Sequence, residues 1–542
     1  MKVLGASIGN CVHTGGIVNF LRIAEENGYR ATFLGPAVPV ERAVEAIRSE
    51  EPELVAISYR LTPENARAIL TEFKEAIGRS GLRKRRFVFG GTPPCAAEAS
   101  RIGLFDAVFD GSQPVQEIVA WLRGEAAAQG QEAYAHSLLE RVEASYPWPL
   151  IRHHFGMPSL DDTVRGAHEI AEARVLDVLS IAPDQNAQEF FFRPEGMRPE
   201  LDGAGGVMVR APQDLRSIYD ATRTGNFPLL RCYSGTNDLV KWAAMLRDTI
   251  QIAWGAVPLF WYSQLDGRSK RPLEVSIAEN VEAMGWYASQ GIPVEVNESH
   301  HWSLRDAPDA VAVTAAFLAA YNAKRAGVRN YVAQYMFNNP RGTSPAMDLS
   351  KMFAKIELIE SLQDQSFRAL REARSGLNSL PLDMDQAKGH LGSSIHTMMA
   401  IRPHIVHVVG YSEANYHTGP TELIESCKIA RGAVRNALLG LSDPMTDEVV
   451  KTRKAELLDE AHYLLERIRE VAPGGVEDPW SEPPSLAKAV KVGILDAPHL
   501  LGNPVACGKT ITRMIDGASR ALDPASGKPM TERQRLKWLR LG

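Results

Sequence analysis

The chain has 542 residues, of which 45% are hydrophobic and 23% are charged, and its formal net charge is −5. This length predicts two or three domains of a globular protein, and the slightly acidic balance gives no electrostatic reason to expect a nucleic acid or an anionic membrane as partner. No apolar stretch approaches the length of a membrane span, and five scattered cysteines without a Cys-x-x-Cys pair are typical of a reducing cytoplasm, where we expect the protein, rather than of a disulfide framework or zinc site.

Residues 1–125 alternate short apolar runs with helical patterns. The apolar runs are 3–8, 54–57, 87–89 and 107–109, and the helical patterns are 16–28, 39–50, 63–79 and 114–123. Strands that alternate with helices at this spacing are joined by crossover connections, which make neighbouring strands parallel. The pattern therefore predicts a doubly wound, flavodoxin-like α/β domain with helices on both faces. We expect five strands, of which these four runs are named.

A histidine, a serine and a glycine pair follow three of these runs. His13 lies in Cys11-Val12-His13-Thr14-Gly15-Gly16, Ser58 follows the second run, and Gly90-Gly91 follow the third. Ligands of open α/β sheets bind at the carboxyl ends of the strands, where an imidazole can reach a metal and paired glycines admit a long ligand. A lone histidine here would more often be structural, but three such elements in register favour a ligand site.

This arrangement resembles the B12-binding domain, whose pattern is Asp-x-His-x-x-Gly, then Ser-x-Leu, then Gly-Gly, over about residues 1–125. The resemblance implies that His13 is the lower axial ligand of cobalt and replaces the cofactor's own dimethylbenzimidazole. It also implies a slot for the freed nucleotide tail beside Gly16, Ser58, Gly90 and Gly91. The other residues expected around the cofactor are Asn10, Cys11, Val12, Thr14, Arg60 and Thr92.

The chain departs from that pattern at two positions. Cys11 stands where the family has an aspartate, and Arg60 stands where it usually has a leucine. The aspartate normally accepts a hydrogen bond from the far nitrogen of the ligand imidazole, which fixes the tautomer and the basicity of the ring. Cys11 cannot supply a carboxylate, so Asn10 or a water molecule is the alternative partner of His13.

The rest of the chain predicts a linker, a second domain and an extension. Residues 126–159 are expected to form the linker, because an Ala-, Gln- and Glu-rich stretch ends in Tyr146-Pro147-Trp148-Pro149. Residues 160–440 show one β-like run every 30–40 residues, which predicts a (β/α)8 TIM-type barrel. The eight runs are 175–182, 206–210, 227–233, 257–262, 294–296, 331–335, 376–382 and 405–409. Residues 441–542 are expected to pack as an extension at the junction of the two domains.

Several barrel segments resemble glutamate mutase (methylaspartate mutase), whose two subunits are a B12 domain and a barrel. These segments are 227–231, 235–238, 419–422 and 493–498. The resemblance implies an adenosylcobalamin-dependent radical isomerase, a carbon-skeleton mutase, in which the B12 domain caps the carboxyl rim of the barrel. Apart from this resemblance, the expected partner of the chain, besides its substrate, is a second copy that forms a homodimer through the barrel.

The same resemblance implies roles for four barrel residues. Arg231, and Arg210 on the preceding run, would clamp a substrate carboxylate, because a guanidinium binds a carboxylate through two hydrogen bonds. Glu413 and Asn415 would contact the adenosyl ribose. For the arginines and for Glu413 the alternative is an ordinary ion pair at the protein surface or barrel rim.

Two further observations bear on the substrate. The family's glutamate for the substrate amine has no counterpart in residues 260–266, so we expect a small carboxylic or amino acid other than glutamate. His300 and His301 follow a predicted strand, and adjacent residues of a strand point to opposite sides, so at most one is expected to face the site.

The alternative functions are a cobalamin-dependent aminomutase, a corrinoid methyltransferase and a non-catalytic B12 sensor or carrier.

Overall fold

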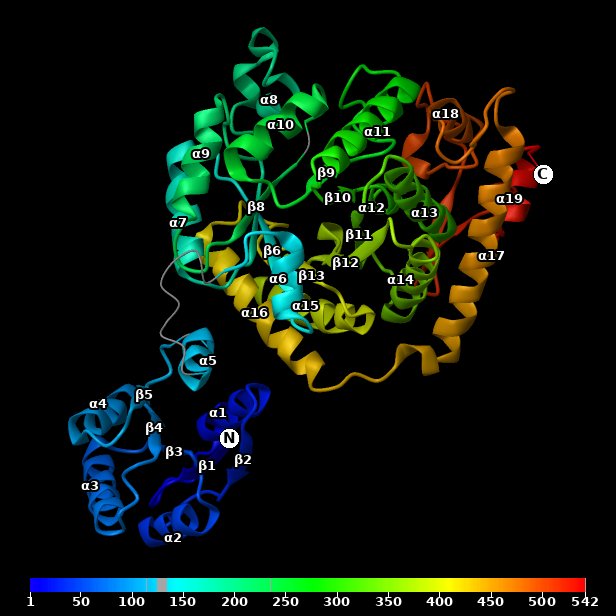
Figure 1. Ribbon diagram of the computed structural model, residues 1–542. Coiled ribbons are helices and arrows are strands. Elements are labelled where there is room, and N and C mark those ends of the chain that lie inside the picture. The colour runs from blue at the N-terminus through cyan, green and yellow to red at the C-terminus, as the bar shows by residue number, and fades with distance from the viewer. Residues whose placement is uncertain (114, 124–133, 234, 542) are drawn as a thin grey trace. The chain divides into compact units, whose positions relative to one another are not determined.

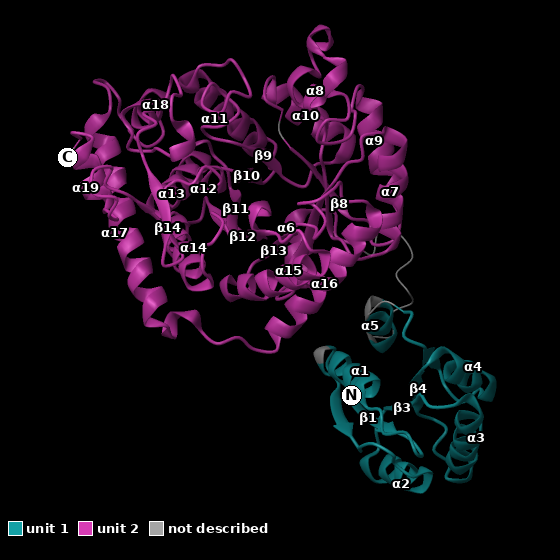
Figure 2. Ribbon diagram, turned by 180° about the vertical axis from the view of Figure 1, so that it is seen from behind, with its two compact units in different colours: residues 1–133 teal, residues 134–542 magenta. Residues whose placement is uncertain are grey.

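The computed structural model describes residues 1–113, 115–123, 134–233 and 235–541. It divides into two compact units, Met1–Ala133 and Tyr134–Gly542, which Figure 2 shows in teal and magenta. Each unit has its own hydrophobic core, and each is described by itself below.

Unit 1 is a five-stranded parallel sheet with helices on both faces (Figure 1). The strands are β1 (Lys2–Ser7), β2 (Arg30–Phe33), β3 (Leu54–Tyr59), β4 (Arg86–Gly91) and β5 (Ala107–Phe109), in the spatial order β2-β1-β3-β4-β5. Its helices are α1 (Gly15–Glu26), α2 (Val40–Glu50), α3 (Pro63–Arg79), α4 (Pro93–Ile102) and α5 (Val115–Arg123). The strand order reverses between β1 and β3, so the ligand crevice is expected beside their carboxyl ends. The flavodoxin-like fold predicted from the sequence is confirmed.

Unit 2 is an eight-stranded parallel sheet that curls into a nearly closed barrel, with β8 and β9 at the ends of the order β8-β7-β6-β13-β12-β11-β10-β9 (Figure 1). The strands are β6 (Leu150–Phe155), β7 (Val178–Ile181), β8 (Leu229–Cys232), β9 (Gly255–Val257), β10 (Val294–Val296), β11 (Asn330–Phe337), β12 (Arg368–Ser375) and β13 (Ile405–Val408). The predicted α/β barrel is confirmed.

Two predicted strands of the barrel are wrong, and two real ones were missed or misplaced. Residues 206–210 form a single β-bridge through Val207, and residues 376–382 form a turn that contains the short helix Leu377–Ser379. The strands in their place are β6, which lies inside the predicted linker 126–159, and β12. Both carry charged side chains that face the barrel interior, so neither shows the apolar run that predicts a buried strand. Residues 124–133 of the predicted linker lie outside the described residues.

Helices connect and surround the barrel strands. They are α6 (Leu138–Ser145), α7 (Leu160–Glu172), α8 (Gln185–Phe190), α9 (Pro212–Ala221), α10 (Leu239–Ile250), α11 (Leu273–Ser289), α12 (Ser299–Ser303), α13 (Asp309–Arg325), α14 (Pro345–Glu360), α15 (Met384–Met398) and α16 (Pro420–Leu438). Helix α13 is buried on nearly every side because α12, α14 and the C-terminal helix α17 (Glu448–Val471) pack around it.

The C-terminal region covers the outside of the barrel. Helix α17 packs on α13 and α14, and α18 (Pro483–Val492) packs on α11. A hairpin of β14 (Thr512–Ile515) and β15 (Ala518–Ala521) and the last helix, α19 (Glu532–Trp538), complete the chain. Its predicted packing at the junction of the two domains stays a prediction. Of the helices that the structure describes, none combines the length and apolarity of a membrane span.

Candidate cofactor and substrate sites

The loop after β1 presents His13 at the carboxyl edge of the unit 1 sheet. The hydroxyl of Ser7, the last residue of β1, donates hydrogen bonds to the carbonyl oxygens of Cys11 (2.8 Å) and His13 (3.3 Å). Cys11 is buried, whereas Val12 and His13 are exposed. Because these hydrogen bonds hold the backbone of the loop against β1, the exposed imidazole of His13 extends into solvent from a well-positioned backbone.

One ring nitrogen of His13 lies beside a sulfur atom. The distance from Cys11 Sγ to His13 Nδ1 is 4.0 Å, so the thiol stands in the place expected for a carboxylate partner. Asn10, the alternative partner, is engaged elsewhere, since its Oδ1 accepts a hydrogen bond of 2.9 Å from the Tyr59 hydroxyl. With Nδ1 beside Cys11, Nε2 is the ring nitrogen that is left for a metal.

A strip of open surface runs beside this loop. Ser58 pairs in register with Ser7 on one side and with Gly90 on the other. Its Oγ is buried and has no hydrogen-bond partner among the described residues. A Cβ atom built on Gly90 or on Gly16 would meet nothing within 4 Å, whereas one built on Gly91 would lie 2.4 Å from the Tyr59 carbonyl oxygen. The strip therefore has room for a ligand and a buried hydroxyl without a partner.

The remaining predicted cofactor residues border the same edge. Thr14 and Thr92 precede α1 and α4, and neither side chain makes a capping hydrogen bond to its helix. Arg60 is exposed directly after β3. The chain thus brings together the residues that the sequence predicts around a cofactor, and the open strip with its unpartnered Ser58 hydroxyl fits the tail of a cobalamin.

One family model matches unit 1. Residues 1–119 match the model of the family described as B12 binding domain. Among solved structures, a novel cobalamin-binding protein from Desulfitobacterium hafniense DCB-2 is 26% identical over 23% of this chain and 59% of that chain, with a TM-score of 0.21. The match spans less than two thirds of that protein, and no curated protein matches the chain. By the family match, residues 1–119 form a B12-binding domain, and cobalamin is the ligand that this family match supports.

Replacing Cys11 by aspartate tests the sulfur contact. We expect cob(II)alamin to bind about 10- to 100-fold more tightly, because a carboxylate at this position accepts the Nδ1–H hydrogen bond and makes the ring a stronger ligand. The measurement is a titration of the full chain followed by the cobalamin absorption spectrum. The Cys11→Ser variant is the control without a charge, and weaker binding by the aspartate variant would contradict the expectation.

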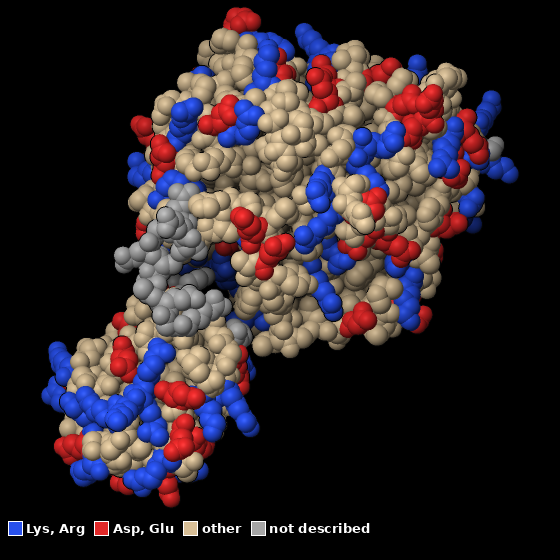
Figure 3. Space-filling view, viewed as in Figure 1, with Lys and Arg blue, Asp and Glu red and all other residues tan. Residues whose placement is uncertain are grey.

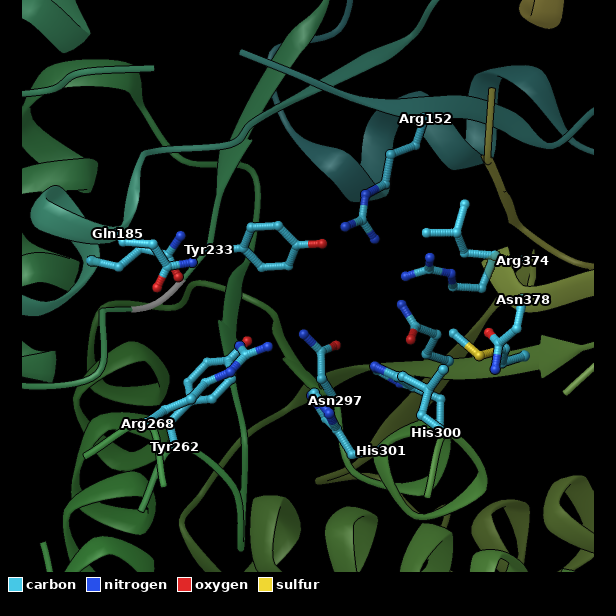
Figure 4. Close-up of a pocket in the computed structure, with 15 residues that line it drawn as sticks. Arg152, Gln185, Tyr233, Tyr262, Arg268, Asn297, His300, His301, Arg374 and Asn378 are labelled. Atoms are coloured by element: carbon cyan, nitrogen blue, oxygen red, sulfur yellow. The ribbon is translucent and has the colours of Figure 1, made fainter. Parts of the chain in front are cut away.

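Unit 2 has a cavity of about 400 Å³ at the carboxyl ends of its strands (Figure 4). Its lining comes from strands β6, β11 and β12, from α8 and α12, and from the loops after β8, β9, β10 and β12. The lining residues are Arg152, Gln185, Gln188, Tyr233, Tyr262, Arg268, Asn297, His300, His301, Leu304, Gln334, Met336, Arg374, Leu377 and Asn378. This is the end of a barrel at which enzymes of this architecture bind their substrates.

The structure places both predicted carboxylate clamps away from the cavity lining. Arg231 is fully buried in the barrel, where its Nη2 lies 2.8 Å from Glu295 Oε2. Arg210 forms ion pairs with Asp184 (2.6 Å) and Asp202 (2.5 Å). Both guanidinium groups therefore already hold protein carboxylates, and their role toward a substrate stays a prediction.

Glu413 and Asn415, the predicted ribose contacts, lie in the loop after β13 and are also outside the cavity lining. Glu413 Oε1 accepts a hydrogen bond of 2.8 Å from the Gly410 backbone and lies 3.5 Å from His153 Nε2. The Asn415 amide donates to the Leu382 carbonyl oxygen at 2.5 Å. Their contact with an adenosyl group stays a prediction.

His300 and His301 both line the cavity, so the expectation that only one of them faces the site is wrong. They lie on the short helix α12 rather than on a strand, and their rings stack with centroids 4.4 Å apart. Burial holds the pKa of both rings well below the ordinary value for histidine, and nearby arginines add to the effect. Both are therefore neutral imidazoles at neutral pH.

A cluster of charged side chains fills the barrel below the cavity. Arg152 Nη1 lies 3.2 Å from Glu295 Oε2 and also binds Glu372, and its Nε donates to the Ser180 hydroxyl at 2.8 Å. Gln334 donates 3.0 Å hydrogen bonds to both carboxylates. Arg152 and Gln334 also line the cavity, so this cluster fixes part of its floor.

Sequence reasoning found part of this site. Gln185 follows the predicted strand 175–182, and Tyr233 and Tyr262 end the predicted strands 227–233 and 257–262, at the edge where the (β/α)8 prediction expects functional side chains. Arg374 was missed because the strand that carries it was placed several residues too late. Ser234, which follows Tyr233, lies outside the described residues.

Proposed function

We propose that the chain is an adenosylcobalamin-dependent radical isomerase, a carbon-skeleton mutase, that acts on a small carboxylic or amino acid. The observation that carries this proposal is the joining, in one chain, of a B12-binding domain to a barrel whose mouth holds a cation-rich cavity. When bound, the cofactor supplies an organic radical through cleavage of its weak cobalt–carbon bond. A barrel cavity of this size suits a small acid as the second reactant.

The residues of unit 1 would hold the cofactor. His13 Nε2 would ligate cobalt, with Cys11 beside Nδ1. The Ser58 hydroxyl would donate to the nucleotide tail, and the open surface at Gly90 would admit that tail. Among the described residues of this edge, Ser58 carries the buried hydroxyl without a hydrogen-bond partner. Binding of the tail to this hydroxyl would therefore break no hydrogen bond of the sheet.

The residues of unit 2 would bind and orient the acid. Figure 4 shows the guanidinium groups of Arg152 and Arg374 and the hydroxyl of Tyr233 pointing toward one space. The Tyr233 hydroxyl is 2.6 Å from His154 Nε2, and the two rings stack with centroids 4.5 Å apart. This contact fixes the direction of the hydroxyl, so it can hold a substrate oxygen in a defined position.

Electron paramagnetic resonance of the anaerobic holoprotein tests the proposal. We expect a coupled signal of cobalt(II) and an organic radical when the correct acid is added to the chain loaded with adenosylcobalamin. The control is the same chain loaded with hydroxocobalamin, which has no cobalt–carbon bond to break. Methyl transfer from methylcobalamin, or a signal that requires pyridoxal phosphate, would instead support the methyltransferase or the aminomutase.

A further inference from the structure

We infer that the substrate of the barrel cavity is a carboxylic acid without an ammonium group, rather than an amino acid. This inference deepens the proposed function and rests on it for the reaction, although the binding preference can be measured separately. It depends on the charges that line the cavity.

Arg374 is the cation that is left for a substrate. It lies on β12, half buried, and no carboxylate of the described residues comes within 4.0 Å of its guanidinium. Its Nε makes a long hydrogen bond of 3.4 Å to the Ser375 carbonyl oxygen. Burial is the main cause that lowers the pKa of five histidines of unit 2, among them His300 and His301, and the charge of Arg374 lowers each of these pKa values further. A half-buried guanidinium without an acidic partner among the described residues is expected to bind an anion.

The other two arginines of the lining, Arg152 and Arg268, form ion pairs with protein carboxylates to different degrees. Arg152 is neutralised by Glu295 and Glu372. Arg268 lies over the ring of Tyr262 at 4.8 Å and is 3.9 Å from Asp266, a carboxylate that Arg305 also approaches to 3.6 Å. Around Asp266 the cations therefore outnumber the acid, and the cavity keeps an excess of positive charge.

No aspartate or glutamate belongs to the described residues that line this cavity. Its other polar groups are amides, hydroxyls and the neutral imidazoles of His300 and His301. On the outer face of unit 2 seen in Figure 3, by contrast, cations and acids are interspersed. A substrate ammonium would lie near arginines without an opposing carboxylate, which is unfavourable, whereas a hydroxyl or carbonyl oxygen can use the neutral groups.

Matched pairs of acids test the inference by calorimetric titration of the full chain. The pairs are succinate and aspartate, glutarate and glutamate, and methylsuccinate and 3-methylaspartate. We expect at least one acid without the ammonium to bind about tenfold or more tightly than its amino partner. The Arg374→Gln variant should weaken that binding at least about tenfold, and Arg374→Lys should weaken it less.

Two further variants make the test specific. Arg368 lies on the same strand but is half exposed and faces Glu143 at 3.7 Å, so Arg368→Gln is the matched control and should bind like the parent chain. Asn297→Asp places a carboxylate in the lining with little change of shape. This variant should reduce the difference in affinity between each acid and its amino partner. Thermal unfolding of each variant shows that it is folded.

The outcomes separate the inference from the proposed function. Tighter binding of the amino acids, or no binding of any of the three acids that lack the ammonium, overturns the inference even if a radical signal is found. A chain that shows the expected preference but gives no radical with adenosylcobalamin contradicts the isomerase and leaves the preference standing.

Discussion

The His13→Ala variant is expected to bind cobalamin at least about 100-fold more weakly than the parent chain, or to hold it with its benzimidazole still on cobalt. His13 is the one histidine of residues 1–133, and its ring is exposed on a loop that Ser7 ties to β1. No second imidazole of unit 1 can therefore replace it. In cob(II)alamin bound to the parent chain, nitrogen coupling should change when the protein is labelled with nitrogen-15, and this response should be lost in the variant.

The control for that experiment is His462→Ala, which removes an exposed histidine from α17 in unit 2. It should leave the binding and the coupling unchanged. Coupling that persists in the His13 variant and still follows the protein label would show that another side chain is the ligand.

The Arg152→Met variant is expected to lower the free energy of unfolding of the barrel by about 3–5 kcal/mol. Removal of this side chain leaves Glu372 without its arginine partner and Glu295 with Arg231 alone, in a barrel interior that excludes water. Burial already raises the pKa of Glu372 in the parent chain, and Glu295 raises it further. The measurement is urea unfolding of the full chain followed by tryptophan fluorescence, since Trp121 is the only tryptophan of unit 1.

The loss of stability in the Arg152→Met variant should depend on pH, and the direction of this dependence follows from the pKa of Glu372. A carboxyl whose pKa is higher in the folded than in the unfolded protein binds more protons when folded, so stability falls as pH rises through the interval between the two values. Loss of Arg152 raises the folded pKa of Glu372 further, and the defect should be largest at neutral pH and smaller in acid. The double variant Arg152→Met with Glu372→Gln should recover part of the loss, whereas an equal loss in both would contradict the ion-pair account.

Much of unit 1 could be predicted from the sequence because its signals are local. Four of its five strands are short apolar runs, whereas β2 (Arg30–Phe33) is not and has no counterpart among the predicted runs. Residues of the candidate cofactor site follow those runs within a few positions, as His13 and Ser58 do. The parallel order then brings the loop of β1, the end of β3 and the end of β4 to one edge without any long-range information. What the sequence could not supply was the partner of His13. In the structure the Tyr59 hydroxyl donates a hydrogen bond to Asn10, and Cys11 is the residue that lies beside the imidazole ring of His13.

The barrel itself followed from the alternation of strands and helices, but the content of its cavity did not. Strands β6 and β12 carry Arg152, Glu372 and Arg374, and charges of this kind in a sequence predict a solvent-exposed segment. Only the folded barrel pairs Arg152 with two carboxylates from other strands and leaves Arg374 with none within 4.0 Å among the described residues. Residue order thus determined the two folds and the cofactor edge, where each signal lies within one loop. The tertiary structure decided which arginines are neutralised and which one can meet a substrate, because ion pairs between distant strands exist only once the barrel has closed.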